Sequence, residues 1–231
     1  MGSIIGSEGE YFHDESCYLS FEVDTEKKTV EASERKEEER REWEKKAKHL
    51  DAHKLVFLDE SGSNIALTRL YARAPKGKRA RGSIPRNRGK NVTVISCLTF
   101  DGLGESFILD GAVNSELFEL YVEQILAPSL KPGQIVIMDN LSIHKRQKVR
   151  ELIEARGCQV LFLPPYSPDF SPIEEAFSKI KAVLRKIGAR TRDALQEALE
   201  YALTTISASD AAGWFRHCGY LPDEPQTAQI S

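Results

Sequence analysis

Short runs of apolar, β-branched residues alternate with longer helical patterns along this chain. Ile135–Met138 is one such run, and residues 159–163 form another. Between them, residues 145–156 have the spacing of a charged helix, and Gly157 follows as a residue that commonly ends helices. Runs this short and this apolar are typical of strands buried on both faces. The order strand, helix, strand therefore predicts a right-handed βαβ unit with two parallel strands.

The part of the chain that precedes this unit has the pattern of antiparallel strands. Residues 54–58 form an apolar run, residues 64–71 alternate apolar and polar side chains, and residues 91–100 form a longer apolar run. We expect the second to be the antiparallel neighbour of the first, and a short strand to follow within residues 105–110. Residues 72–89 are rich in Gly, Pro, Arg and Lys, which cannot pack a core, so they predict a hairpin arm.

Helical periodicity covers much of the remaining chain. Asn114 is a candidate N-cap for a helix that we expect to end at Pro128. Pro172 opens another helix at its first turn, and Thr191 is placed to cap a third. Strands, a βαβ unit and amphipathic helices together predict an α/β protein with a mixed sheet flanked by helices. The helices are expected within residues 27–50, 115–126, 172–187, 191–206 and 207–219.

Length and composition limit the organisation of the protein. The 231 residues, 41% of them hydrophobic, suffice for one sizeable core and a smaller appendage. We expect a loosely ordered tail over residues 1–26, a solvated, charged linker helix over 27–53, a catalytic domain over 54–220 and a frayed end over 221–231. No apolar run has the length of a membrane span. The four scattered cysteines form no CxxC pair, so the sequence predicts neither a zinc site nor a disulfide framework. This cysteine usage fits a protein of the reducing cytoplasm.

The net charge of −3 hides an uneven distribution along the sequence. Between Ser61 and Phe100 there is no acid, and nine bases fall there, so the predicted arm carries a strong local positive field. Such a field can hold a phosphate backbone, although a merely solvated loop is the alternative. The candidate DNA-binding residues are Arg73, Lys76, Lys78, Arg79, Arg81, Arg86, Arg88 and Lys90, with His144 and Lys145 from the loop after Ile135–Met138. For His144 the alternatives are a structural or simply exposed side chain, or one that supports a site residue without contacting DNA.

Acidic residues follow two of the predicted strands. Asp59 comes after residues 54–58, and Asp139 comes after Ile135–Met138. If these strands are parallel neighbours, both carboxylates emerge at one edge of the sheet, the usual place for chemistry in such folds. They would repel each other unless a cation such as Mg²⁺ lay between them. The alternative for either acid alone is a turn former or a helix cap.

Three sequence blocks carry a close resemblance to a known family. Asp-Glu-Ser-Gly at 59–62, Met-Asp-Asn-Leu-Ser-Ile-His-Lys at 138–145 and Leu-Pro-Pro-Tyr-Ser-Pro-Asp-Phe-Ser-Pro-Ile-Glu at 163–174 resemble the signature blocks of DDE transposases. The resemblance is to the bacterial insertion-sequence branch of the mariner superfamily. The 34 residues between Asp139 and Glu174 (174 − 139 − 1) match the family's spacing. Ser171 stands where the family usually has Asn, and Phe177 where it usually has Trp.

The resemblance implies a ribonuclease-H-like fold and a metal-dependent reaction on DNA. Asp59, Asp139 and Glu174 would be the catalytic residues and the ligands of two Mg²⁺ or Mn²⁺ ions. The reaction would be cleavage of DNA at transposon ends, followed by joining of the freed 3′-hydroxyl to target DNA, within a homodimer. Glu175 is a rival third ligand, because helical geometry alone does not choose between neighbours; the family's spacing favours Glu174.

The front of the chain departs from the family pattern, since no helix-turn-helix precedes the first block. We expect either that an end-reading module is encoded separately or that the gene is truncated or frameshifted. Two alternative functions stay open at this point. One is a nuclease or junction resolvase of the same fold that does not transfer strands. The other is an inactive remnant that binds DNA or dimerises with intact relatives.

Overall fold

The computed structural model describes residues 35–69 and 71–222. The predictions for the tail at 1–26 and for most of the end at 221–231 therefore lie outside the described residues, as does the first part of the expected linker helix. Within the described part, no helix is both long enough and apolar enough to cross a membrane.

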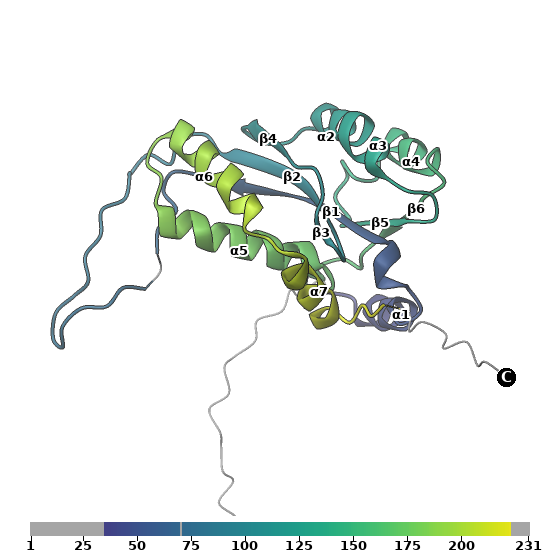
Figure 1. Cartoon of the computed structure of the whole chain (residues 1–231), viewed down its shortest axis with the longest axis horizontal. Coiled ribbons are helices and arrows are strands. Elements are labelled where there is room, and N and C mark those ends of the chain that lie inside the picture. The colour runs from purple at the N-terminus through teal and green to yellow at the C-terminus, as the bar shows by residue number, and fades with distance from the viewer. Residues whose placement is uncertain (1–34, 70, 223–231) are drawn as a thin grey trace, which may run out of the picture. The chain divides into compact units, whose positions relative to one another are not determined.

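The described chain forms a six-stranded mixed sheet in the order β3-β2-β1-β5-β6, with β4 also paired to β2 (Figure 1). The pairs β1–β5 and β5–β6 are parallel, and β2 pairs antiparallel with β1, β3 and β4. The predicted βαβ unit and the mixed sheet are thus confirmed. The strands are β1 Leu55–Ser63, β2 Val92–Thr99, β3 Gly102–Leu103, β4 Phe107–Asp110, β5 Ile135–Met138 and β6 Gln159–Phe162.

Helices cover both faces of the sheet, as Figure 1 shows. The helices are α1 Glu37–Ala47, α2 Ser115–Tyr121, α3 Ala127–Ser129, α4 Gln147–Glu154, α5 Pro172–Ile187, α6 Arg192–Thr204 and α7 Ala208–His217. Side chains alternate along β1: Leu55 and Phe57 pack on the side of α5, α6 and α7, while Val56 and Leu58 pack on the side of α2 and α4. Both sets are apolar, as a strand buried on both faces requires.

The expected strand at residues 64–71 is not formed within its described residues. β1 continues to Ser63, and its antiparallel neighbour is β2, in a register from Val56↔Thr99 to Ser63↔Val92. Residues 64–69 turn away instead, and the carbonyls of Ile65 and Leu67 accept hydrogen bonds from the Arg190 guanidinium. The side chains of Ile65 and Leu67 pack against the core, although the described residues of the segment form no backbone hydrogen bonds with a neighbouring strand. Their burial explains why apolar and polar residues alternate here as they do in a strand.

The basic segment between β1 and β2 also differs from expectation. Its described residues up to Lys90 contain no strand, so the predicted hairpin arm is an irregular loop, which Figure 1 draws between the two strands. One helix boundary is wrong too. A π-helical turn, Val122–Leu126, joins α2 to α3, and Pro128 lies in the first turn of α3 instead of ending the helix. The predicted caps at Asn114 and Thr191 are both formed.

Helix α1 is packed against the body of the protein, which corrects the prediction of a solvated linker helix. Arg40, Trp43 and Ala47 are buried. The indole Nε1 of Trp43 donates a hydrogen bond of 3.0 Å to the hydroxyl of Tyr220, near the end of the described chain. The sequence did not predict this buried face of α1, because three buried side chains among many exposed charged ones give only a weak helical periodicity.

Candidate active site

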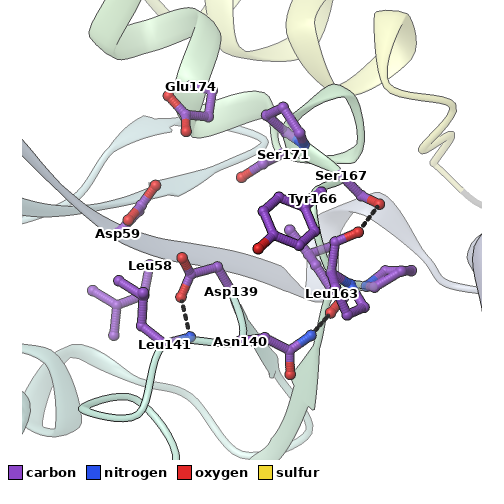
Figure 2. Close-up of a pocket in the computed structure, with 13 residues that line it drawn as sticks. Leu58, Asp59, Asp139, Asn140, Leu141, Leu163, Tyr166, Ser167, Ser171 and Glu174 are labelled. Carbon is purple, nitrogen blue, oxygen red and sulfur yellow. Dashed lines mark hydrogen bonds between the residues drawn. The ribbon is translucent and has the colours of Figure 1, made fainter. Parts of the chain in front are cut away.

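Three acids that are far apart in sequence line one pocket of about 450 Å³. Asp59 comes from β1, Asp139 follows β5, and Glu174 lies in the first turn of α5. Figure 2 shows their carboxyl groups facing the same space. The parallel register Phe57↔Ile137 explains the first two positions, because both strands bring the next residues to the same edge of the sheet.

Asp59 lies inside β1, although the sequence placed it after the end of a strand. The parallel pairing of β1 with β5 stops at Phe57, but the antiparallel pairing with β2 continues and sets Asp59 opposite Ser96. Asp59 is therefore held by one ladder while its other side is open to the pocket. A strand position of this kind fixes a carboxylate more rigidly than a loop does.

The electrostatic setting of Asp59 is unfavourable for a negative charge. The pKa of Asp59 is raised to about 8, mainly by burial and also by the negative charges of Glu60, Glu174 and Asp139. One hydrogen bond, donated by the backbone N–H of Glu60, acts in the opposite direction. Among the described residues, no ion pair of Asp59 with a basic side chain is formed. A buried carboxyl group that is surrounded by other acids and has no basic partner is typical of sites that accept a cation.

Asp139 is held in the opposite way, by a buried histidine. His144 Nδ1 donates to Asp139 Oδ1 at 2.5 Å, and His144 Nε2 donates to Glu60 Oε2 at 3.0 Å. Burial would lower the pKa of His144, but these two bonds raise it to about 9, so the ring is cationic at neutral pH. Burial would raise the pKa of Asp139, yet the bond from His144 leaves that pKa below its ordinary value.

His144 is 1% exposed and packs against the ring of Phe118 at 4.5 Å between centroids. The expectation that His144 contacts DNA is therefore wrong, because a side chain this buried is not accessible to a DNA backbone. Its ring bridges the carboxylates of Asp139 and Glu60. Sequence reasoning missed its partner Glu60; the adjacent acids Asp59 and Glu60 were the available signal.

Glu174 and Glu175, which helical geometry left undecided, have different surroundings. Glu174 lines the pocket with the two aspartates. Glu175 Oε1 instead lies 3.1 Å from Nδ1 of His217 in α7, on another side of α5. The helix is fixed in this rotation by its buried side chains, which include Phe177, Ile180 and Leu184. Ser171 precedes the helix but makes no side-chain cap.

The donor set of the pocket suits a hard divalent cation. Three carboxylates offer only oxygen ligands, which Mg²⁺ and Mn²⁺ prefer. As the side chains stand, no group of three or more His, Cys, Asp or Glu residues in the described chain is arranged to hold a metal ion. Binding would therefore require the acids to close on the ion, which the excess negative charge around Asp59 favours.

The basic residues of the loop between β1 and β2 lie at the surface, as does Lys145. Lys145 is exposed, with its ammonium 5.9 Å from the centre of the Phe162 ring. The loop presents all eight of its expected DNA-binding residues to solvent: Arg73, Lys76, Lys78, Arg79, Arg81, Arg86, Arg88 and Lys90.

The fold and the acid pocket agree with membership of the DDE superfamily. The model of the family described as "DDE superfamily endonuclease" matches residues 54–196, and the chain belongs to this family. Among individual proteins, it is similar to the transposable element Tc1 transposase of Caenorhabditis elegans, with 27% identity over 180 residues, 74% of this chain and 63% of that protein.

Solved structures of Mos1 transposase share the fold. The pre-cleavage Mos1 transpososome matches with a TM-score of 0.67 and 15% identity, over 86% of this chain and 64% of that one. The Mos1 mariner paired-end complex with Mn matches with a TM-score of 0.66 and 19% identity, over 88% and 64%. This likeness confirms the predicted ribonuclease-H-like fold class. The chain spans less than two thirds of the length of these relatives.

Proposed function

We propose that the chain is the catalytic part of a transposase, which cleaves DNA at transposon ends and joins them to target DNA. The observation that carries the proposal is the meeting of Asp59, Asp139 and Glu174 in one pocket. The similarity to Tc1 and Mos1 transposases supports the same reaction class. The free thiols of Cys97 and Cys158 suit a reducing compartment such as the cytoplasm.

Asp59, Asp139 and Glu174 would hold two Mg²⁺ or Mn²⁺ ions. Bound there, the ions would activate water or a 3′-hydroxyl as the attacking group and stabilise the leaving oxygen of an in-line displacement at phosphorus. The side chains prepare the site for this chemistry. His144 keeps Asp139 ionised and fixed, and Asp59 would release its proton to solvent on binding a cation.

The exposed basic loop between β1 and β2 would supply the phosphate contacts. Its bases from Arg73 to Lys90 have no acidic neighbour in sequence, and all of their side chains are exposed. Lys145 would add a positive charge beside the loop that follows Asp139. Mos1 transposase forms a paired-end complex with the left transposon end, which supports an active assembly of this chain on two DNA ends; such an assembly would be a homodimer.

The proposal is tested with a supercoiled plasmid as a non-specific probe. We expect the full chain to nick it in Mn²⁺ or Mg²⁺ and not in EDTA, and Asp59→Asn, Asp139→Asn and Glu174→Gln each to abolish nicking. A second assay offers an oligonucleotide with a free 3′-hydroxyl and measures its joining to the plasmid. Nicking without joining would favour the nuclease or resolvase alternative, and nicking that survives all three substitutions would overturn the assignment of the site.

A further inference from the structure

Tyr166 has an unusual backbone at the edge of the acid pocket. Its φ is 52°, and among the described residues it is the only one other than glycine with a positive φ. This left-handed region is uncommon for bulky side chains and is adopted where the surroundings impose it. A glycine or asparagine would fit the turn with less strain. The presence of tyrosine therefore points to a use for its ring.

The chain around Tyr166 is held firmly while the ring is left free. Pro164 and Pro165 precede it, and the hydroxyl of Ser167 donates to the Pro165 carbonyl at 3.1 Å. Ser167 is buried, and its own carbonyl accepts a hydrogen bond from the N–H of Phe170. The Tyr166 side chain nevertheless remains 59% exposed. Its backbone therefore needs no further ordering when a ligand arrives.

The ring lines the same pocket as the three acids, as Figure 2 shows. Leu141, 48% exposed, also lines this pocket, as do Leu58 and Leu163. A volume of about 450 Å³ lies in the range of sites for single small ligands, roughly 300–1,000 Å³. It can admit one nucleotide beside the acids and is too small for a stacked duplex.

We propose that Tyr166 is a stacking platform for the nucleobase next to the phosphate on which the acids act, held there after it leaves the duplex. The inference rests on the proposed function, since it places a DNA phosphate at Asp59, Asp139 and Glu174. Aromatic rings stack on any base, so the subsite takes a single unpaired nucleotide without a strong sequence preference. Extruding the base exposes the adjacent phosphate to the carboxylates.

The test compares ring, hydroxyl and backbone at this position in the full chain. Stacking on an aromatic ring is worth about 1–3 kcal/mol per base, which corresponds to a loss of about 5- to 150-fold. We expect Tyr166→Ala to slow Mn²⁺-dependent cleavage of a paired duplex within this range, and Tyr166→Phe to stay within about twofold of wild type. Tyr166→Gly suits the positive φ and repeats the test if the alanine variant does not fold. Tyr201→Ala, which removes an exposed tyrosine of α6, is the matched control.

A second readout reports stacking directly, in proteins made inactive by Glu174→Gln. Each is bound to a duplex carrying 2-aminopurine beside a position that the active protein has been shown to cleave in Mn²⁺. Its fluorescence should change on binding to the protein that keeps Tyr166 and to the Tyr166→Phe protein, and should not change on binding to Tyr166→Ala. A duplex with that base mispaired should lessen the cleavage defect of Tyr166→Ala in the active protein, because less unstacking is then required.

Two results would overturn the stacking role. One is an equal loss of cleavage in Tyr166→Phe and Tyr166→Ala, which would assign the effect to the hydroxyl. The other is wild-type cleavage by Tyr166→Ala, which would leave the proposed function standing. A wild-type chain that cleaves no DNA would overturn both the stacking role and the proposed function.

Discussion

Arg40 and Asp169 lie 129 residues apart in the chain, and their side chains form a two-point ion pair, with Nη1–Oδ1 at 3.0 Å and Nη2–Oδ2 at 2.5 Å. The guanidinium is buried and also lies 4.1 Å from the centre of the Phe170 ring. The pair joins α1 to the short 3-10 helix Pro168–Phe170, from which the chain leads into α5 and Glu174. Helix α1 thereby supports the loop that carries the third acid.

Removing this support should weaken the fold. We expect Arg40→Ala to lower the free energy of unfolding by roughly 2 kcal/mol, less than for a fully buried pair because the Asp169 side chain is 54% exposed. Urea denaturation at pH 7 measures the loss. Glu39→Gln, which removes an exposed pair with Lys36, is the control and should change stability by less than about 0.5 kcal/mol.

The same pair sets a pH dependence. Burial would raise the pKa of Asp169, but the hydrogen bonds from Arg40 leave that pKa below its ordinary value. A carboxyl with a lowered folded-state pKa stabilises the protein above the unfolded pKa and stops doing so as pH falls through the folded value. The stability difference between wild type and Asp169→Asn should therefore be full at about pH 6 and shrink below about pH 4. A difference that stays constant in acid down to about pH 2 would contradict this role.

Trp43 anchors the same helix through its ring and its indole nitrogen. Trp43→Ala should cost about 3–5 kcal/mol, because it empties a buried site. Trp43→Phe should cost about 1 kcal/mol, since the Tyr220 hydroxyl keeps its bond to the Phe170 carbonyl at 2.7 Å. Thermal unfolding of both variants tests the docking of α1. Equal, small effects would mean that the helix does not contribute to the stability of the domain.

Asp59 should destabilise the metal-free protein at high pH. Its folded-state pKa of about 8 lies above the ordinary value of 3.8, so the folded state holds the proton more tightly and stability falls as pH rises between these values. We expect Asp59→Asn to be more stable than wild type by about 2 kcal/mol at about pH 8 in EDTA, well under the upper bound of about 6 kcal/mol for such a shift. Urea unfolding at about pH 5 and about pH 8 measures the difference.

Adding Mn²⁺ provides the reciprocal measurement on the same variants. The wild type should gain stability, by about 2.7 kcal/mol at about one hundred times the dissociation constant, whereas Asp59→Asn should gain little. Asp101→Asn, at an exposed turn, is the control and should respond like the wild type. An equal response of Asp59→Asn and wild type would place the ion elsewhere.

His144 should contribute both to stability and to activity. Its pKa is raised from 6.5 to about 9, so its stabilising effect is complete below pH 6.5 and is lost as pH rises through about 9. We expect His144→Gln to lose roughly 2 kcal/mol at about pH 6 and little at about pH 10, and to slow nicking about 10- to 100-fold because Asp139 is no longer oriented. His217→Gln, at an exposed histidine, is the control. Wild-type nicking by His144→Gln would exclude this orienting role.

Glu174 and Glu175 offer the sharpest comparison in the site. Glu174→Gln should abolish nicking, since it removes a pocket carboxylate, while Glu175→Gln should keep wild-type activity because it breaks only the surface pair with His217. The two substitutions are adjacent and chemically identical, so the measurement is insensitive to general effects on the helix. Loss of activity in Glu175→Gln alone would reverse the assignment.

Local pattern predicted most elements of this fold correctly. The run Ile135–Met138 has the bounds of β5, and the caps Asn114 and Thr191 begin α2 and α6 as expected. The prediction of a strand at residues 64–71 failed, because the alternation of apolar and polar residues there reflects side-chain packing and not hydrogen bonding between strands. Ile65 and Leu67 pack against the core, which gives residues 64–69 the pattern of a strand. Their carbonyls, however, accept hydrogen bonds from the Arg190 guanidinium and not from a neighbouring strand.

By itself the sequence determined the strand order of the βαβ unit, the family motifs and the three acids, because each is written in neighbouring residues or in a fixed spacing. Only the tertiary structure decided which way α5 turns Glu174 and Glu175, that His144 is buried between Asp139 and Glu60, and that α1 is packed through Arg40 and Trp43. These relationships join residues far apart in the chain. Their free energy comes from burial and charge pairing that no local window of sequence contains.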